Sequence, residues 1–324
     1  MQIAIDVMGG DFGPPVFVRA AIELLDEHND LTLQLYGDAA QIEPLIDTQY
    51  RGKIEVTAAA SLNPHECDGK AVLLHGRDSS LFKAVNAVAS GSADLCVSAG
   101  SSAALMVVSL RLLGTLRGVK RPAICKAFPT AHGNPYLLDL GANAECEAQV
   151  LSQFALMGSA LVTLRDGRDK PTVRLLSNGI EPTKGTRVIR EAAKMLKAEA
   201  QINFQGFIEP DELFTTTTDI IVCDGFSGNV ALKSCEGTAS MLLAQFRQML
   251  DDQGCNVTQG LEELERRFSP DRHNGAFFLG INGIIVKSHG SADHAATLSC
   301  LQEAVTLGRS NWLAAIESVF TAKI

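Results

Sequence analysis

The stretch D-I-I-V-C-D-G-F-S-G-N, residues 219–229, is an apolar strand run that ends in a glycine loop. Glycine has no Cβ, so backbone N–H groups there are open to an anion, and the N-terminus of a following helix attracts negative charge. Five other junctions share this form: M-G-G-D-F-G-P at 8–14, S-A-G-S-S-A at 98–103, D-L-G-A-N at 139–143, S-N-G-I-E-P-T-K-G at 177–185 and K-S-H-G-S-A-D at 287–293. The repetition predicts an α/β enzyme for an anionic, phosphate-bearing substrate.

Strand and helix patterns alternate along the chain. The clearest helical pattern runs from 186 to 198, with apolar residues at helical spacing and basic residues on the other face. Alternation of this kind predicts βαβ units in a three-layer αβα fold with a mainly parallel sheet, whose carboxyl edge gathers the six loops. Apolar strand runs are expected at 2–7, 31–36, 54–58, 94–98, 122–127, 136–140, 172–176, 202–206, 219–223 and 283–287.

The composition excludes several protein classes. With 324 residues, 46% hydrophobic and 20% charged, the chain can bury a large core, as a single α/β domain over 1–324 that could divide into two lobes. No apolar run approaches the roughly 18 residues of a membrane span, and the start lacks a signal-peptide pattern, so a cytoplasmic protein is expected. The eight cysteines form no C-x-x-C pair, so neither zinc nor a disulfide framework is indicated.

Charge is distributed unevenly. The net charge of −9 argues against binding of nucleic acid. Between Asp94 and Asp139, however, no acidic residue occurs, while basic residues accumulate. This segment is either a docking surface for an acidic partner or a helix end whose basic residues face the helix dipole. The basic residues in question include Arg111, Arg117, Lys120 and Arg121.

Two further segments are unusually apolar. Residues 104–113 are apolar nearly all round, which places them in the core or in a subunit interface. Residues 239–250 are amphipathic and open a protruding helical and loop element at 239–280. This element packs on the sheet or on a second subunit, or it touches a membrane or an acyl chain, although Glu262, Glu263 and Glu265 disfavour anionic lipid.

Familiar nucleotide and nucleophile motifs are missing. There is no G-x-G-x-x-G after the first strand, no G-x-x-x-x-G-K-[ST] and no G-x-S-x-G. The loops instead carry Asp, Asn, Lys and Ser beside glycine. Such side chains bind and orient anions without implying a covalent intermediate.

Taken in order, the six loops closely resemble those of the phosphate acyltransferase (PlsX) family. The most distinctive segments are D-G-F-S-G-N-V-A-L-K-S-C-E-G at 224–237 and V-K-S-H-G-S-A-D at 286–293. The resemblance implies a fold like the isocitrate/isopropylmalate dehydrogenase and phosphotransacetylase group, and a homodimer. It also implies conversion of long-chain acyl-carrier-protein thioester and inorganic phosphate into acyl phosphate, early in bacterial phospholipid synthesis. The enzyme would be cytoplasmic and would visit the inner face of the membrane, where it would contact a downstream glycerol-phosphate acyltransferase.

The sequence departs from the family pattern in two places. Ser101-Ser102-Ala103 stands where many members carry Asn-Thr-Gly, and the segment before Asn274 is more acidic than expected of a membrane-touching element. The first departure changes which hydroxyl and amide groups that loop offers. The second weighs against direct lipid contact.

The implied reaction needs no metal and no organic cofactor, because phosphate is itself a nucleophile. Lys184 and Lys233 would stabilise negative charge on the carbonyl oxygen. Asp224 and Asn229 would orient phosphate or the pantetheine arm, and His289 would protonate the departing thiolate. Two of these residues have a structural alternative: Asp224 as a turn or cap residue, and His289 as a satisfied structural donor.

Candidate phosphate and substrate ligands are the polar and glycine positions of the same loops. Asp11 either binds a hydroxyl or caps the helix beginning near Pro14, and Lys287 either binds phosphate or forms an ion pair. The full set is Gly9, Gly10, Asp11, Ser98, Ser101, Ser102, Asn143, Asn178, Gly179, Gly225, Gly228 and Lys287.

Acyl carrier protein is acidic, so the basic residues between Asp94 and Asp139 are expected to form its docking surface.

Fold alone does not determine function, and three alternative functions stay open. They are a short-chain phosphotransacetylase, a metal- and NAD-dependent hydroxy-acid dehydrogenase of the same fold group, and a non-catalytic anion-binding module.

Overall fold

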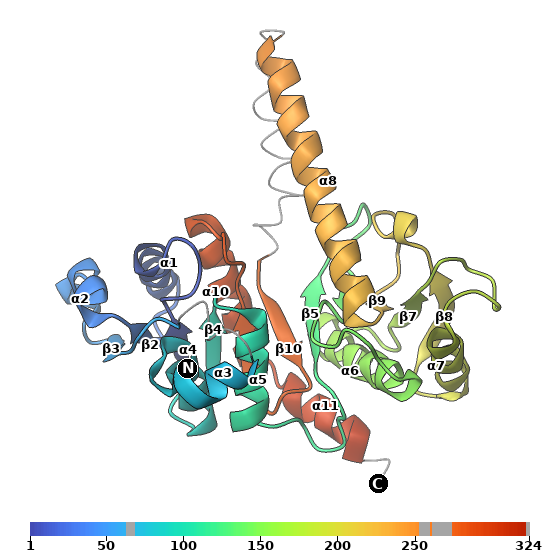
Figure 1. Cartoon of the computed structure of the whole chain (residues 1–324), viewed down its shortest axis with the longest axis horizontal. Coiled ribbons are helices and arrows are strands. Elements are labelled where there is room, and N and C mark those ends of the chain that lie inside the picture. The colour runs from blue at the N-terminus through green and yellow to red at the C-terminus, as the bar shows by residue number, and fades with distance from the viewer. Residues whose placement is uncertain (63–68, 253–259, 261–273, 322–324) are drawn as a thin grey trace. The chain divides into compact units, whose positions relative to one another are not determined.

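The computed structural model describes residues 1–62, 69–252, 260 and 274–321, with helices and strands alternating along the chain (Figure 1). The chain forms two compact units. Unit 1 comprises Met1–Ile124, Ala160–Arg168 and Asn274–Ile324, and unit 2 comprises Cys125–Ser159 and Asp169–His273.

Unit 1 contains a mainly parallel sheet in the order β3-β2-β1-β4-β11-β10. Asp6, Ser98 and Lys287 lie side by side in register on three adjacent parallel strands, so these strands end at the same edge. The last strand, β10, pairs antiparallel to its neighbour. The strands are β1 (Gln2–Asp6), β2 (Thr32–Gly37), β3 (Ile54–Ala58), β4 (Leu95–Ser98), β10 (Ala276–Leu279) and β11 (Ile284–Lys287).

The helices of unit 1 cover both faces of its sheet (Figure 1). Ser79, Ser101 and Asp293 each accept a hydrogen bond from a backbone N–H of the first turn that follows, and so fix where three of the helices begin. The helices are α1 (Pro14–Glu27), α2 (Ala39–Ile42), α3 (Gly69–His75), α4 (Ser80–Ala89), α5 (Ser102–Leu112), α10 (His294–Arg309) and α11 (Trp312–Thr321), with short 3₁₀ turns η1 (Glu43–Leu45), η2 (Thr48–Tyr50) and η4 (Gly76–Asp78).

Unit 2 has its own strands, in the order β5-β6-β9-β7-β8. Only β5 is antiparallel to its neighbour within this unit, so β6, β9 and β7 end at one edge. The strands are β5 (Ala123–Ala127), β6 (Tyr136–Leu138), β7 (Thr172–Leu176), β8 (Asn203–Ile208) and β9 (Ile220–Val222), and the helices are α6 (Ala148–Asp166), α7 (Arg187–Ala198), α8 (Gly225–Asp252) and the short η5 (Pro210–Glu212). The first residues of β5 and the last turns of α6 count with unit 1.

A β-bulge bends β8. Phe204 pairs with Val173, but Phe207 pairs with Leu175, so three steps along β8 match two steps along β7. The extra residue is accommodated at Gly206, whose φ is 91°. Because side chains alternate along a strand, the bulge brings both phenylalanines to the same face of the sheet.

Helix α8 extends well past the strands of its own unit (Figure 1). Met241, Leu242, Phe246 and Met249 are between 45% and 55% exposed. The expectation that this stretch packs on the sheet is therefore wrong for these four side chains. The rest of the protruding element expected at 239–280 lies largely outside the described residues, except for β10 and the residues just before it.

The expected fold class is confirmed. Each of the ten expected strands is present, and the helix expected at 186–198 is α7. The buried helix expected at 104–113 is α5, with Leu105, Met106 and Val108 in the core. The sequence missed β10. Over the described residues, no helix is long and apolar enough to cross a membrane.

Candidate active site

Three of the expected loops meet at the strand edge of unit 1. A Cβ on Gly9 would lie 2.4 Å from the backbone nitrogen of Gly100, and a Cβ on Gly10 would lie 2.9 Å from the carbonyl oxygen of Gly290. The N–H of Asp11 donates to that same carbonyl oxygen at 2.8 Å. The loops that follow β1, β4 and β11 therefore touch through their backbones, and glycine is required for that approach.

A buried carboxylate lies beneath these loops. Asp6 accepts a hydrogen bond from the Ser98 hydroxyl at 2.6 Å and another from the N–H of Met8 at 3.2 Å. The Ser98 oxygen in turn accepts from the N–H of Gly100 at 3.0 Å. Burial raises the pKa of Asp6. The structure thus places Ser98 inside the loop framework, and it adds Asp6, which sequence reasoning missed although it closes the apolar run of β1.

Lys287 makes hydrogen bonds to the loop that follows β4 and to the loop that follows β11. Its ammonium donates to the carbonyl oxygen of Ala99 at 3.3 Å and also to the carbonyl oxygen of Ser288. These contacts orient a positive charge at the edge where β4 and β11 end.

The side chain of His289 is exposed, and its backbone N–H is bound by a buried side chain. Its N–H donates to the side-chain oxygen of Asn274 at 2.8 Å, and its ring nitrogen Nδ1 lies 2.9 Å from the hydroxyl of Ser291. The amide of Asn274 also donates to the hydroxyl of Ser288 at 2.7 Å. Asn274 is 6% exposed and was not singled out from the sequence, because it lies in a segment without strand or helix rhythm.

The start of α5 offers donors to a ligand. Ser101 caps the helix through the N–H of Ala104, at 3.3 Å. Among the described residues, the N–H groups of Ser102 and Ala103 have no acceptor. Two backbone donors at a helix N-terminus are suited to an anion.

Asp11 does not cap the helix that follows it. Helix α1 begins at Pro14, and its N-cap is Gly13, with a φ of 61° and no side-chain hydrogen bond. The capping alternative for Asp11 is therefore wrong. The Asp11 side chain is exposed beside the glycine loops, which leaves binding of a hydroxyl as its predicted role.

In unit 2, a second buried carboxylate organises the loop after β6. Asp139 is fully buried and accepts from the N–H groups of Gly141, Ala142 and Asn143 at 3.1, 3.0 and 2.7 Å. The expectation that D-L-G-A-N offers these N–H groups to an anion is wrong, because the protein itself occupies them. The side chain of Asn143, expected to bind substrate, also contacts the protein itself, since its amide donates to Asp139 at 2.9 Å.

The loop after β9 interlocks with this one. The N–H of Gly225 donates to the carbonyl oxygen of Asn143 at 2.7 Å. A Cβ on Gly228 would lie 1.9 Å from the carbonyl oxygen of Asp139. The two loops are therefore packed backbone against backbone, and glycine at 225 and 228 is a packing requirement.

Asp224 caps α8, as its structural alternative proposed. Its carboxylate accepts from the N–H of Ser227 at 2.7 Å and from the Ser227 hydroxyl at 3.0 Å. Asn229 follows on the first turn of α8 and is exposed, as is Phe226. Of the two expected orienting residues, Asn229 is the one whose side chain faces solvent.

Lys233 lies one turn beyond Asn229 and belongs to a charged cluster. Its ammonium is 2.7 Å from the Glu236 carboxylate, and that of Lys126, on β5, is 3.3 Å from it. Burial alone would raise the pKa of Glu236, but Lys126 and Lys233 lower it overall. Two cations therefore contact one anion.

The loop after β7 carries Lys184. A Cβ on Gly179 would lie 2.6 Å from Cγ of Lys184, so the lysine stem lies across that glycine. Asn178 accepts the N–H of Gly185 at 3.0 Å and closes the loop. Lys184 is exposed, and no described residue makes a hydrogen bond or ion pair with its ammonium.

The basic residues expected to dock a partner lie at the end of α5 and in the segment that follows it. Arg111, Arg117, Lys120 and Arg121 are all exposed. In the described part of the chain, no group of three or more His, Cys, Asp or Glu side chains could hold a metal ion.

The chain matches known proteins along nearly its whole length. A family model described as "Fatty acid synthesis protein" matches residues 1–314. Phosphate acyltransferase from Herminiimonas arsenicoxydans is 42% identical over 306 residues, which is 90% of this chain and 86% of that protein. The same-named protein from Pseudomonas savastanoi pv. phaseolicola is 42% identical over 320 residues, or 95% of this chain and 93% of that protein.

Solved structures share the fold at much lower identity. A phosphotransacetylase from Streptococcus pyogenes has a TM-score of 0.63 and 19% identity, with 95% of this chain and 94% of that chain covered. A branched-chain phosphotransacylase from Enterococcus faecalis has a TM-score of 0.62 and 15% identity, covering 96% and 100%. A 4-hydroxythreonine-4-phosphate dehydrogenase from Klebsiella pneumoniae has a TM-score of 0.51 and 12% identity, covering 95% and 97%. These likenesses confirm the expected fold group.

Proposed function

Because this chain belongs to the phosphate acyltransferase family, we propose that it transfers a long-chain acyl group from acyl carrier protein to inorganic phosphate. The products are acyl phosphate and free acyl carrier protein, in an early step of bacterial phospholipid synthesis. The chain is accordingly an enzyme of the acyltransferase class. The resemblance inferred from the six loops is confirmed.

The reaction exchanges one bond to the acyl carbon for another. A phosphate oxygen attacks the thioester carbonyl, a C–O bond forms, the C–S bond breaks, and the thiolate takes up a proton. Phosphate is already nucleophilic near neutral pH, so the protein has to bind it, exclude water and stabilise the charge that develops on the carbonyl oxygen. The proposal includes no metal and no organic cofactor.

The observation that carries the proposal is the position of Lys184. Its stem lies across Gly179 in a closed loop, and no described residue pairs with its ammonium. A cation that no described residue pairs with is suited to a phosphate dianion or to an oxyanion. In the proposed roles, Asn229 orients phosphate or the pantetheine arm, Lys233 stabilises negative charge on the carbonyl oxygen, and exposed His289 supplies the proton to the thiolate.

The first test is phosphate-dependent loss of long-chain acyl-carrier-protein thioester, with acyl phosphate trapped by hydroxylamine. Wild type should form acyl hydroxamate, and Lys184→Ala should lower kcat by about 10²–10³, as loss of one preorganised donor does. The control Lys53→Ala removes a lysine of unit 1 whose ammonium donates to the side chain of Asn29, and it should keep wild-type activity. Absence of phosphate-dependent hydroxamate in wild type would refute the proposal, and preference for acetyl-coenzyme A would support the short-chain phosphotransacetylase alternative.

The proposal extends to partners and location. Arg111, Arg117, Lys120 and Arg121 dock the acidic acyl carrier protein, and their exposure supports that role. The enzyme is cytoplasmic and forms a homodimer, which the exposed apolar side chains of α8 support. Peripheral contact with the inner face of the membrane, and with a downstream glycerol-phosphate acyltransferase, is part of the same proposal.

A further inference from the structure

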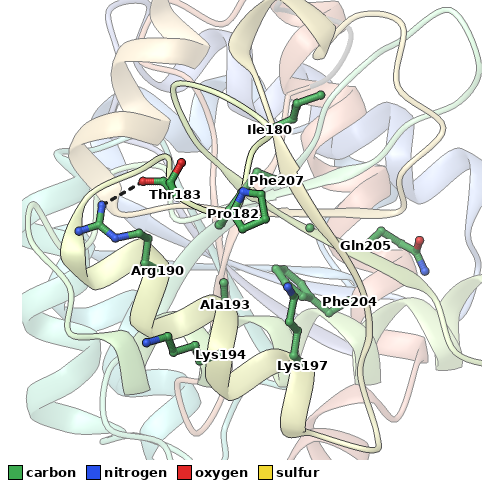
Figure 2. Close-up of a pocket in the computed structure, with 11 residues that line it drawn as sticks. Ile180, Pro182, Thr183, Arg190, Ala193, Lys194, Lys197, Phe204, Gln205 and Phe207 are labelled. Atoms are coloured by element: carbon green, nitrogen blue, oxygen red, sulfur yellow. Dashed lines mark hydrogen bonds between the residues drawn. The ribbon is translucent and has the colours of Figure 1, made fainter.

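Unit 2 contains an open hollow of about 690 Å³ between α7, β8 and the loop that carries Lys184 (Figure 2). None of the described residues that line it is acidic. The lining combines apolar side chains with three cations, and it belongs to a single unit. The lining residues that matter here are Ile180, Pro182, Phe204, Phe207, Lys194 and Lys197.

The floor of the hollow is aromatic because of the β-bulge at Gly206. The bulge turns Phe204 and Phe207 to one face, and their ring centroids lie 6.5 Å apart at an interplanar angle of 82°. Phe204 is only half-buried, so part of its ring is open to whatever occupies the hollow. A flat apolar surface of this kind favours a ligand with its own apolar carbon atoms.

The three cations of the hollow differ in what they already bind. Arg190 donates to the carbonyl oxygens of Gly185 and Thr183, the latter at 3.5 Å (Figure 2), so it holds the loop. Lys194 and Lys197 are exposed, and neither has a hydrogen bond or ion pair with any described residue. Three positions apart on α7, they lie on the same side of the helix. In Figure 2 Lys197 reaches toward Phe204, whereas the ammonium of Lys194, one turn earlier on α7, is turned away from it. The hollow is therefore lined by two lysines without a described partner and by an aromatic surface.

This combination selects among ligands by chemistry. Inorganic phosphate would pair with the lysines but leave the aromatic floor uncovered, and a bare acyl chain would cover the floor but leave two cations without a counter-charge. A phosphate ester joined to a slender arm of methyl and amide groups satisfies both. Thr183 and Gln205 also line the hollow, and their backbone and side-chain polar groups are of the kinds that hydrogen-bond to amides.

We propose that this hollow binds the phosphopantetheine arm of acyl carrier protein, with the phosphate at Lys194 and Lys197 and the geminal methyl groups on Phe204. The inference rests on the proposed function, because it assumes a carrier-bound thioester. Ile180, Pro182 and Thr183 line the hollow and belong to the same loop as Lys184. A phosphopantetheine arm that lies along these three residues therefore runs toward Lys184, the lysine proposed to stabilise the charge on the thioester carbonyl oxygen.

The test compares two small substrates that differ only in the phosphate, acyl-phosphopantetheine and acyl-pantetheine. In wild type, the phosphate should raise kcat/KM by about tenfold or more, as a charge-assisted contact does. In the double variant Lys194→Ala/Lys197→Ala, that factor should fall to about one, while the KM for inorganic phosphate stays unchanged. Arg187→Ala is the matched control: it removes an exposed cation of the same helix that pairs with Glu191 outside the hollow, and it should keep the factor.

Binding of phosphopantetheine and pantetheine, measured by calorimetry on the same proteins, gives an answer that does not depend on turnover. The inference is overturned if the double variant keeps the wild-type preference for the phosphorylated arm in binding and in turnover. A rise in the KM for inorganic phosphate in that variant would also overturn it, because the lysines would then serve the other substrate. Failure of wild type to consume carrier-protein thioester would refute the proposed function, and the binding comparison would still decide the hollow.

Discussion

Two glycines on α8 differ sharply in what a methyl group would meet. At Gly228 a Cβ would lie 1.9 Å from the carbonyl oxygen of Asp139, whereas at Gly237 nothing lies within 4 Å. Gly228→Ala should therefore destabilise the protein by about 3 kcal/mol or more, and Gly237→Ala should stabilise it by up to about 1 kcal/mol through helix propensity. Urea unfolding measures both. Equal effects at the two positions would contradict the interlocked loops.

Glu236 makes stability depend on pH in a definite direction. Its folded pKa is lowered below 4.5, so its stabilising charge is fully present above pH 4.5 and is lost as pH falls through the folded value. Glu236→Gln should cost about 1–2 kcal/mol near neutral pH, because the pair with Lys126 is only partly buried, and should cost little in strong acid. Thermal unfolding of both proteins from pH 7 to pH 3 checks this. A constant difference across that range would speak against the cluster.

At the residue scale, the sequence predicted residue types but not their partners. D-L-G-A-N drew attention to Asn143, whereas the organising group is Asp139 of the same motif. Whether a loop N–H is open to a ligand depends on which side chain folds back on it, and local patterning does not contain that contact. Asp6 was missed for the same reason.

The exposed apolar side chains near the end of α8 lead to a prediction about assembly. Replacing Phe246 and Met249 by Glu should convert a homodimer into a monomer, because charge on this face opposes its burial against a second copy. The matched control is Gln245→Glu/Gln248→Glu, which adds the same charge at exposed polar positions of the helix. Sedimentation equilibrium measures the mass. A monomeric wild type, or a dimer in all three proteins, would refute this role for α8.

Strands were predictable where they alternate with helices. The strands expected at 54–58 and 172–176 coincide with β3 and β7. The sequence missed β10, four residues long and antiparallel, because it follows a segment without βα rhythm and is too short for its pattern to separate strand from helix. The strand expected at 202–206 continues to Ile208. A glycine at 206 suggests that the strand ends there, but the bulge takes up one residue and Phe207 and Ile208 pair with β7 again.

The whole molecule has a net charge of −9 and therefore repels an acidic partner, so binding of such a partner depends on a local basic surface. Arg117→Glu with Lys120→Glu should raise the KM for acyl carrier protein by about tenfold at low ionic strength, and by less in high salt, where charges are screened. The KM for phosphate should not change. The control Arg19→Glu/Arg51→Glu reverses two other exposed cations of unit 1 and should leave both constants unchanged. An unaltered KM in low salt would move the docking surface elsewhere.

The fold class was predictable because six strand-to-loop junctions recur in one chain. The division into two units had no such signal. Unit 1 is assembled from three separate stretches of the chain and unit 2 from two, so no single linker marks a boundary in the composition. Residues that are distant in the sequence build each unit, so local sequence patterns do not indicate where a unit begins or ends.

Asp139 also has a consequence for how fast this protein exchanges hydrogen with the solvent. The loop from 139 to 143 has no regular secondary structure, yet the amide hydrogens of Gly141, Ala142 and Asn143 all point to one buried carboxylate. In deuterated water they should exchange as slowly as amides in the neighbouring strands, since exchange requires the loop to open. A loop that looks mobile by its irregular shape would then be among the slowest segments of unit 2 to take up deuterium.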